Sequence, residues 1–309
     1  MPIFCLRKLF SLICSLWIVA TLTFVLMKTI PGDPFSEEQA LRADMHEKLL
    51  QQQGFNDPLL LQYGRYISSL LRGDLGYSLK HQGRSVNAII NEHFPVSALL
   101  GLTAFCLALG GGVLLGAWGA LKEGKKQGHF VIFLTTAGLS IPSFILAPLL
   151  QYFFAIQLGW LPLARWGSLP QAILPSIALA SLPAAFIAKL VCTSLNEVLQ
   201  TDYIKAARAK GLAPSRVIFS HALRNALLPV LSYLGPLLAN ILVGSFIIEK
   251  IYSIPGLGAW FINSVMNRDY ALIMGLTLFY SGILMFSIFL VDVAYGWLDP
   301  RLRIQTRER

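Results

Sequence analysis

The chain has 309 residues, of which 55% are apolar and 13% are charged, and its formal net charge is +9. The charged share is about half that of an ordinary soluble domain, so the composition excludes a soluble globular protein and favours an integral membrane protein. The four cysteines, Cys5, Cys14, Cys106 and Cys192, lie in or beside apolar segments and predict neither a disulfide framework nor a metal cluster.

The first apolar element lies within residues 1–30. Leu9 to Met27 is a run of 19 residues without a charge, and it follows Arg7 and Lys8. A helix of about 20 apolar residues spans the hydrocarbon core, so the run predicts a first transmembrane helix. A cleaved signal peptide is the alternative, but the run exceeds the usual apolar core of ~7–15 residues and no small-residue cleavage site follows it. The Pro-Gly-Asp-Pro sequence at 31–34 then ends the helix.

Residues 31–94 form the longest polar stretch, with mixed charge and several turn signals. Tyr63, Tyr66 and Leu70 recur at helical spacing, which predicts an amphipathic helix packed on the membrane bundle. The stretch is too short for a domain with a large core of its own. We therefore expect a sizeable, folded loop on the outer side of the membrane.

Five further apolar segments lie within residues 95–309 and predict a core of five transmembrane helices. They are Val96–Leu121, Phe130–Ile156, Ala172–Cys192, Pro229–Ile248 and Ala271–Val291. The expected fold class is therefore all-α, a polytopic membrane bundle of six transmembrane helices. Gly112 and Gly116 indicate close helix packing in the second span, and Pro142 and Pro148 would kink the third.

The positions of Lys and Arg predict the orientation of this bundle. With the N terminus in the cytoplasm, the inner segments hold 14 of the 25 Lys and Arg residues and the outer segments hold 10. The remaining one is Lys189, near one end of the fourth span. Seven of the outer ones, Lys28 included, lie before the second span and mostly in the long loop, where charge constrains orientation only weakly, so the bias predicts that both termini lie in the cytoplasm. The basic excess follows from topology and requires no nucleic-acid partner.

One apolar run, from Ile254 to Asn267, is too short to cross a bilayer. It lies between the fifth and sixth predicted spans, on the outer side. We expect a re-entrant or interfacial helix there.

Residues 202–229 are a polar, basic insertion between two apolar segments, reading DYIKAARAKGLAPSRVIFSHALRNALLP. Helix formers run from Tyr203 to Lys210, Gly211 supplies a left-handed cap, and Pro214 can start a second helix. The second helix carries an apolar stripe of Ile218, Phe219, Ala222, Leu223, Ala226 and Leu227. Charge and periodicity fit a docking surface for a soluble protein and a basic loop on anionic lipid headgroups equally well.

At these residues the chain resembles the cytoplasmic coupling loop of ATP-binding-cassette importer permeases, whose motif is Glu-Ala-Ala, three residues, Gly, and a later Leu-Pro. The corresponding residues are Lys205, at the position of the Glu, and Ala206, Ala207, Arg208, Gly211 and Pro229. Further short sequence motifs resemble the dipeptide, oligopeptide and nickel branch of that family. They are Pro-Gly-Asp-Pro at 31–34, Ile-Glu at 248–249, Ile-Pro-Gly-Leu-Gly at 254–258, Asn-Arg-Asp-Tyr at 267–270 and Trp-Leu-Asp-Pro-Arg at 297–301.

The resemblance implies a permease subunit of an ATP-driven importer for peptides or a similar small solute, embedded as a multi-pass protein in the bacterial inner membrane. Its implied partners are a second permease subunit, which would form a heterodimer with this chain, two cytoplasmic ATPase subunits and an outer solute-binding protein. ATP and magnesium would be bound by the ATPase subunits, and this chain would bind no cofactor. The cargo stays open between dipeptide, oligopeptide, glutathione and a nickel chelate.

Catalytic and metal-binding patterns are weak throughout the sequence. Gly119 and Gly124-Lys125 have the spacing of a phosphate-binding loop, but Lys126 occupies the Ser or Thr position and the segment follows a membrane span instead of a strand. The five histidines show no metal-ligand spacing. The sequence therefore predicts no catalytic residue, no metal site and no ATPase site in this chain.

The predicted spans hold almost no interior acid or base, whereas a proton- or sodium-coupled carrier usually needs such groups near the bilayer midplane. A permease driven by an attached ATPase can receive its energy through a cytosolic docking surface instead. An ATP-independent carrier or channel is the alternative function, and a non-transporting membrane scaffold is a third. Polar candidates for a substrate pathway, each of which could equally bond two helices, are Ser140, Ser143, Gln151, Tyr233, Asn240 and Ser245.

Overall fold

The computed structural model describes residues 2–29, 57–81, 83–163, 165–242 and 245–298. The regular elements of these residues are helices, and an isolated β-bridge joins Tyr77 to Ser85. The helices are α1 (Pro2–Thr29), α3 (Leu59–Leu71), α4 (Val86–Leu121), α5 (Lys126–Ser140), α6 (Ser143–Leu150), the π-helix η1 (Gln151–Gln157), α7 (Leu169–Leu199), α8 (Asp202–Ala209), α9 (Pro214–Arg216), the π-helix η2 (Val217–Ala222), α10 (Leu223–Ala226), α11 (Leu228–Leu242), α12 (Phe246–Ile251), α13 (Leu257–Met266) and α14 (Tyr270–Leu298).

Five helical stretches of the described chain are long and apolar enough to cross a membrane. Four of them lie in α1, α4, α7 and α14, and the fifth runs from Leu228 to Ile251, through α11 and α12. The Pro-Gly-Asp-Pro sequence at 31–34 lies outside the described residues. The all-α membrane bundle predicted from the sequence is confirmed, although the second helix begins at Val86 instead of Val96.

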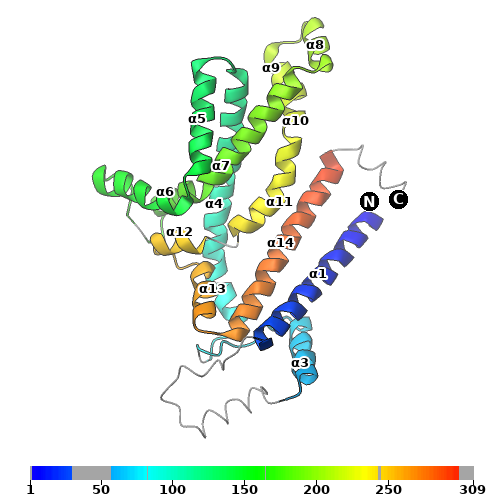
Figure 1. The fold of residues 1–309 in the computed structure, drawn as a ribbon, viewed down its shortest axis with the longest axis vertical. Coiled ribbons are helices and arrows are strands. Elements are labelled where there is room, and N and C mark those ends of the chain that lie inside the picture. The colour runs from blue at the N-terminus through cyan, green and yellow to red at the C-terminus, as the bar shows by residue number, and fades with distance from the viewer. Residues whose placement is uncertain (1, 30–56, 82, 164, 243–244, 299–309) are drawn as a thin grey trace. The chain divides into compact units, whose positions relative to one another are not determined.

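The third predicted span departs from the expected kinked helix over Phe130–Ile156. It consists of α5 and the α6–η1 helix, which meet at 106°, so the count of spans reaches six only if this bent pair is one span. Pro142 cannot donate a backbone hydrogen bond and drives Ile141 into an extended conformation (φ −89°, ψ 115°), which ends α5. Figure 1 shows α6 leaving α5 at a steep angle.

The chain divides into two compact units, and each is described by itself. The first comprises Met1–Pro95 and Ala259–Gly282, and the second Val96–Gly258 and Ile283–Arg309.

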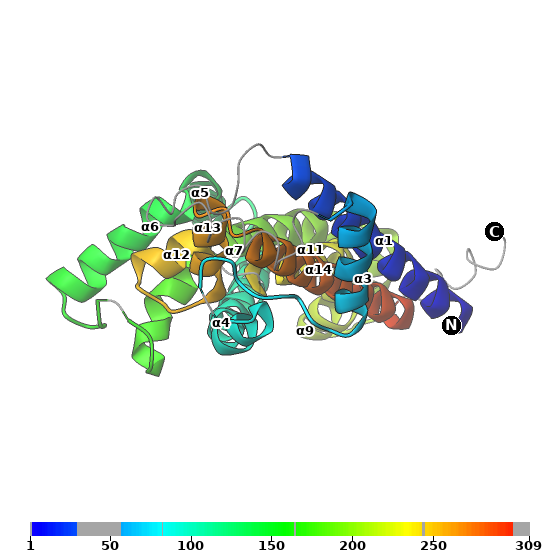
Figure 2. The same cartoon turned by 90° about the horizontal axis from the view of Figure 1, so that it is seen from below.

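In the first unit, α3 packs on the second half of α1, as Figures 1 and 2 show from two directions. The Phe24 ring lies 5.4 Å from that of Tyr63 and 5.7 Å from that of Tyr66. The hydroxyl oxygens of Thr21 and Tyr63 are 2.8 Å apart. This contact confirms the predicted amphipathic helix in the polar stretch after the first span.

A buried carboxylate organises another part of the first unit. Asp269 is 1% exposed and accepts hydrogen bonds from the Ser78 hydroxyl, from the Leu79 amide at 3.1 Å and from the Leu272 amide at 3.2 Å. The last bond caps the first turn of α14, because Leu272 follows Asp269 by three residues. Asp269 therefore fixes the chain before α4 to the start of α14.

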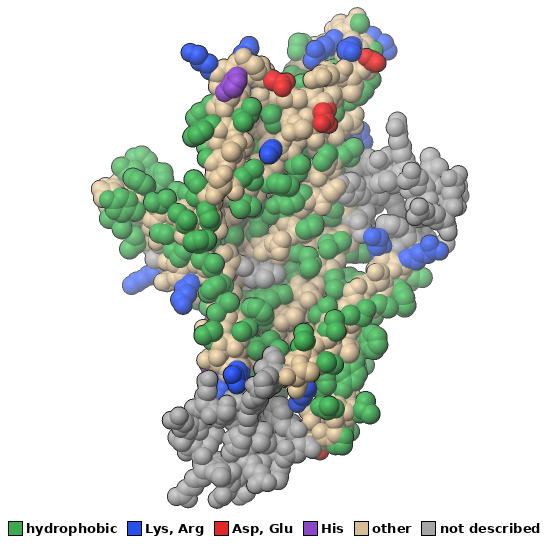
Figure 3. Space-filling view, viewed as in Figure 1, with side chains coloured by type: hydrophobic (Ala, Val, Ile, Leu, Met, Phe, Trp, Pro, Cys, Tyr) green, Lys and Arg blue, Asp and Glu red, His purple; other side chains and the backbone are tan. Residues whose placement is uncertain are grey.

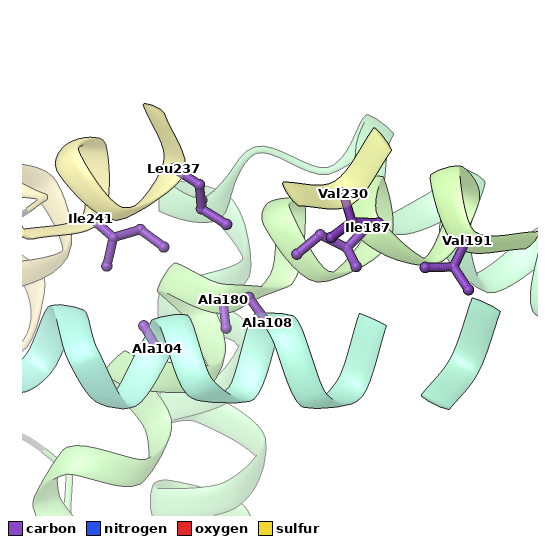
Figure 4. Packing of buried hydrophobic residues seen from close by; sticks show 8 residues of the cluster. All are labelled: Ala104, Ala108, Ala180, Ile187, Val191, Val230, Leu237 and Ile241. Atoms are coloured by element: carbon purple, nitrogen blue, oxygen red, sulfur yellow. The ribbon is translucent and has the colours of Figure 1, made fainter. Parts of the chain in front are cut away.

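The core of the second unit forms where α4, α7 and α11 meet. Figure 4 shows Ala104 and Ala108 of α4, three residues of α7 and three of α11 converging in one cluster. Small residues on α4 bring its backbone close to α7. A Cβ added at Gly112 would lie 2.8 Å from the Ala184 carbonyl oxygen, and one at Gly116 would collide with the Ala188 carbonyl. The close packing predicted from the glycine spacing is confirmed.

Candidate functional site

Residues 202–229, named the coupling segment below, leave the end of α7 and lead into α11. The first limb of the segment is α8, and the second runs from Pro214 to Ala226 through α9, η2 and α10. Figure 1 shows α8 and α9 together at one end of the second unit. Two short helical limbs joined at a glycine are what the sequence predicts.

The two faces of α8 have different surroundings. Ile204 and Ala207 are buried, whereas Lys205, Ala206 and Arg208 are exposed. Positions three residues apart on a helix share a face, so Ile204 and Ala207 form the side that packs on the bundle. Of the two adjacent alanines, Ala207 is therefore used for internal packing and Ala206 is exposed.

The turn after α8 is a hydrogen-bonded helix cap. The Gly211 amide donates to the Arg208 carbonyl at 3.0 Å, and the Leu212 amide donates to the Ala207 carbonyl at 3.4 Å. This pair of bonds is the Schellman motif, which needs a left-handed residue after the helix. Gly211 has φ +76°, as the sequence predicts for the cap. The turn sends the chain back toward the bundle at a defined angle.

The second limb differs from the regular helix we predicted. Its buried residues are Val217, Ala222 and Ala226, which are separated by five and then four positions. The π-helix η2 explains the longer step, because a π turn adds one residue and shifts every later side chain around the axis. Phe219, predicted on the apolar stripe with Ala222 and Ala226, is 70% exposed, so it does not share their burial.

A tyrosine ties the two limbs together. The Asn225 side-chain amide donates to the Tyr203 hydroxyl at 2.8 Å, and that hydroxyl donates to the His221 carbonyl at 3.5 Å. Lys205 also pairs with Asp202 at 2.9 Å, but both side chains are exposed and such a pair contributes little. The tyrosine contacts, which span about 20 residues of sequence, hold the limbs as one piece.

The coupling segment rests on the ends of two long helices. Ala120 of α4 and Leu195 of α7 form one hydrophobic cluster with five buried residues of the limbs, which are Ile204, Ala207, Val217, Ala222 and Ala226. Close-packed clusters transmit displacement, so a force on the segment reaches both helices. The exposed side is basic, and Figure 3 shows Lys and Arg side chains gathered at this end. Those of the segment are Lys205, Arg208, Lys210, Arg216 and Arg224.

The polar candidates for a substrate pathway are spread over several elements. Three of them form side-chain hydrogen bonds, each with a residue that lies nearby in the sequence. The Ser140 hydroxyl donates to the Thr136 carbonyl at 2.8 Å, within α5. The Gln151 side-chain amide donates to the Leu163 carbonyl at 2.7 Å. Ser245 caps α12 by accepting from the Ile248 amide at 3.4 Å. These bonds give the three residues structural roles and leave their place along a pathway a prediction.

The remaining candidates lie on α6 and α11. Tyr233 packs its ring 4.6 Å from that of Phe186, Asn240 is exposed, and Ser143 opens α6. Pro229, the last residue of the coupling segment, stands in the first turn of α11, where its missing amide costs no helical hydrogen bond. The six pathway candidates therefore remain separate predictions instead of one assembled site.

Two buried carboxylates escaped the sequence analysis as functional residues. Glu249 and Asp269 are 0% and 1% exposed. Each lies in a short motif that carries the family resemblance, but hydrophobic periodicity gives no sign that a single acid is buried. A usable signal for Glu249 was the Gly-x-Gly at 256–258, since glycines so placed indicate close approach of another group.

In the described part of the chain, no group of three His, Cys, Asp or Glu side chains could hold a metal ion. The spacing that resembles a phosphate-binding loop covers the end of α4 and the turn before α5. Gly119 is inside α4, and Gly124 forms a left-handed turn (φ +72°) before α5. A phosphate-binding loop follows a strand and wraps its amides around the phosphates, which this geometry does not provide.

Comparison with known families and proteins gives consistent matches. Residues 112–304 match the family described as binding-protein-dependent transport system inner membrane component, and residues 1–101 match its N-terminal membrane component. The chain is 45% identical to the dipeptide transport system permease protein DppB of Bacillus subtilis over 302 residues, covering 98% of each chain. It is 42% identical to the oligopeptide transport system permease protein OppB of Salmonella typhimurium over 302 residues, covering 97% of this chain and 99% of that one.

A solved structure of the MetNI methionine ABC transporter in an inward-facing conformation has a similar fold. The TM-score is 0.51 at 23% identity, and the match covers 68% of this chain and 94% of that one. The likeness concerns the arrangement of the helices alone.

Proposed function

Since this chain belongs to the family of binding-protein-dependent transport system inner membrane components, we propose that it is the permease subunit through which an ATP-driven importer moves peptides across the inner membrane. The observation that carries the proposal is the coupling segment, a two-limbed basic surface packed on the ends of α4 and α7. The peptide cargo rests on the near full-length identity to dipeptide and oligopeptide permeases. A dipeptide and an oligopeptide fit the proposal equally.

The family functions with ATPase and substrate-binding subunits. For this chain the proposed assembly contains a second, different permease, two cytoplasmic ATPase subunits, which bind ATP and magnesium, and one outer solute-binding protein. The permease itself binds no cofactor in this proposal. The setting of Gly119, inside α4, and of Gly124, in a turn between two helices, supports this part of the proposal, because neither glycine stands in a strand-to-helix loop.

Transport then follows from the mechanics of the coupling segment. In the proposed cycle, the exposed face of α8 and the Gly211 turn lie in a groove of an ATPase subunit. Closure of the ATPase pair around ATP displaces the segment and, through its hydrophobic cluster, the ends of α4 and α7. The bundle passes from inward-open to outward-open, and hydrolysis resets it. Such a shift requires the docked segment to interact differently with the two ATPase states.

One observation favours the alternative, an ATP-independent carrier. Glu249 is a fully buried acid within the candidate span Leu228–Ile251, and buried acids often serve ion-coupled transport. Its carboxylate already accepts bonds from Ser97 and Gly258, which is the environment of a structural acid. We therefore favour ATP-driven transport.

Reconstitution into proteoliposomes separates the two functions. The complete transporter should take up a labelled peptide only with ATP and the solute-binding protein, and this chain alone should give no flux. Peptide flux through the chain alone, with or without a proton gradient, would establish the carrier instead. If the complete transporter took up a different solute and peptides did not compete with that uptake, the proposed peptide cargo would be wrong.

A further inference from the structure

Glu249 lies at the centre of a buried polar node that joins three elements of the second unit. The Ser97 hydroxyl, from α4, donates to Glu249 Oε1 at 2.7 Å, and the Gly258 amide, from α13, donates to Glu249 Oε2 at 3.0 Å. Ser97 Oγ in turn accepts from the Leu257 amide at 2.8 Å. Glu249 and Ser97 are both 0% exposed, so these bonds replace all of their hydration.

The node holds the beginning of α13 against α4. The first amides of a helix have no partner inside it, and here the amides of Leu257 and Gly258 are satisfied by the node. Two glycines make room for the carboxylate. A Cβ at Gly256 would collide with Glu249, and one at Gly258 would lie 2.9 Å from its Oε2. The two glycines of the Ile-Pro-Gly-Leu-Gly sequence at 254–258 are thereby explained by one acid.

The node lies close to points where the chain passes from one compact unit to the other, so it can restrain movement at these points. The chain passes between the two compact units at three points, which follow Pro95, Gly258 and Gly282. All three are residues that weaken a helix, because proline removes a hydrogen bond and glycine adds backbone freedom. Ser97 is two residues beyond the first point and Gly258 is at the second. The Glu249 node therefore ties two of the three crossings to each other.

We propose that Glu249 is a positioning residue for transport, which makes the beginning of α13 and the adjoining turn of α4 move as one body during the cycle. The proposal rests on the transport function proposed above. Without the carboxylate, the beginning of α13 would no longer follow α4, and displacement delivered by closure of the ATPase pair would be lost at the glycines. Glu249 need not touch the peptide.

The experiment compares peptide transport per ATP hydrolysed in the complete transporter. Glu249→Ala should lower this ratio by about tenfold, within the range for residues that carry coupling, while ATP hydrolysis continues. Ser264→Ala is the matched control, because among the described residues that buried hydroxyl bonds only to the Phe261 carbonyl within α13. The control should keep the wild-type ratio.

A disulfide can test the mechanical role without the charge. A Cβ at Gly256 would lie 2.5 Å from Ser97 Oγ, which suits a bridge between cysteines at these positions once the Glu249 side chain is removed. In a background with the four native cysteines replaced by serine, the triple variant Glu249→Ala, Ser97→Cys, Gly256→Cys should be uncoupled when reduced. Oxidation should restore the transport ratio, and a reductant should abolish it again.

Three results would overturn the proposal: a wild-type ratio in Glu249→Ala, the same loss in Ser264→Ala, or no restoration when mass spectrometry shows the disulfide formed. If Glu249→Ala does not accumulate in the membrane, Glu249→Gln replaces it. Gln keeps the shape and one acceptor but leaves the Ser97 hydroxyl without its carboxylate, so a lowered ratio is expected and an unchanged one contradicts the proposal. Failure of the wild-type transporter to move peptide would instead count against the function itself.

Discussion

Gly211 shows how a single backbone angle shapes the coupling segment. Its φ is +76°, and a Cβ added there would meet no atom within 4 Å. Replacement by valine therefore costs only the left-handed backbone conformation, about 1–2 kcal/mol. We expect Gly211→Val to lower peptide uptake per ATP hydrolysed while the amount of protein in the membrane stays normal. Parallel measurement of uptake and phosphate release in proteoliposomes checks this.

Gly124 provides the matched control for that substitution. It has φ +72° and equally open surroundings, but it lies in the turn between α4 and α5, outside the coupling segment. Gly124→Val should impose the same strain and leave the ratio of uptake to hydrolysis unchanged. Normal coupling in Gly211→Val, or equal losses in both variants, would count against the role of the Gly211 turn.

A second residue-scale prediction concerns Asp269. Asp269→Ala leaves the Ser78 hydroxyl and the amides of Leu79 and Leu272 without their acceptor, and each unsatisfied buried donor costs about 1–3 kcal/mol. We expect the Leu79 and Leu272 amides to exchange hydrogen much faster in the variant, which mass spectrometry of the purified protein can follow.

Asp57 supplies the comparison for Asp269, because it also bonds a neighbour in the first unit. Its partner is Arg65 at 2.6 Å, in a pair that remains accessible to water. Asp57→Ala should change stability by roughly 0–1 kcal/mol. If Asp57→Ala accelerated exchange at Leu79 and Leu272 as much as Asp269→Ala, burial would not be the reason for the effect.

At the scale of the element, the contact between α4 and α7 predicts opposite effects of one substitution at two glycines. Gly116→Ala places a methyl group against the Ala188 carbonyl, and overpacking of this kind costs about 1–3 kcal/mol. A Cβ at Gly110, in the same helix, would meet nothing within 4 Å, so Gly110→Ala should stabilise by roughly 0.5–1 kcal/mol. Thermal unfolding of the purified protein in detergent measures both, and destabilisation of equal size at the two sites would refute the packing account.

The elements differ in how far the sequence alone could predict them. The close packing at Gly112 and Gly116 of α4 was predictable, because small residues four positions apart let two helices approach closely. The Gly211 cap was predictable too, because a glycine after a helix favours the left-handed backbone conformation. The exposed Phe219 was not, since the π turn in η2 depends on contacts that no spacing rule contains. The 106° break after Ile141 was predicted as a kink, because proline sets a probable break point but not its angle.

The candidate site divides in the same way. Its motif residues could be identified from the sequence, yet the burial of Ala207 and exposure of Ala206 required the packing of α8 to be known. Glu249 shows the reverse case. Its importance becomes visible only when Ser97 and Glu249 are seen to share three hydrogen bonds with each other and with residues 257 and 258, although Ser97 lies about 150–160 positions earlier in the sequence than the other three.

At the scale of the whole molecule, the distribution of Lys and Arg predicts that both termini lie in the cytoplasm and that residues 31–94 lie outside. Single cysteines labelled with a membrane-impermeant reagent test this in intact cells and in inverted vesicles. A cysteine at Ser68 should react from the outside, and one at Ser215 should react from the inside. Labelling of both from the same side would exclude the six-span topology.

The central claim is that a separate ATPase drives this bundle through the coupling segment, and crosslinking from Ala206 tests it most directly. Ala206→Cys carrying a photoactivated crosslinker should attach to the ATPase subunit in assembled membranes, with a yield that changes when ATP is bound. Trp160→Cys, expected at the outer surface, should give no such product. A label at position 206 that is reached only from outside, or that joins no nucleotide-hydrolysing protein, would contradict the account.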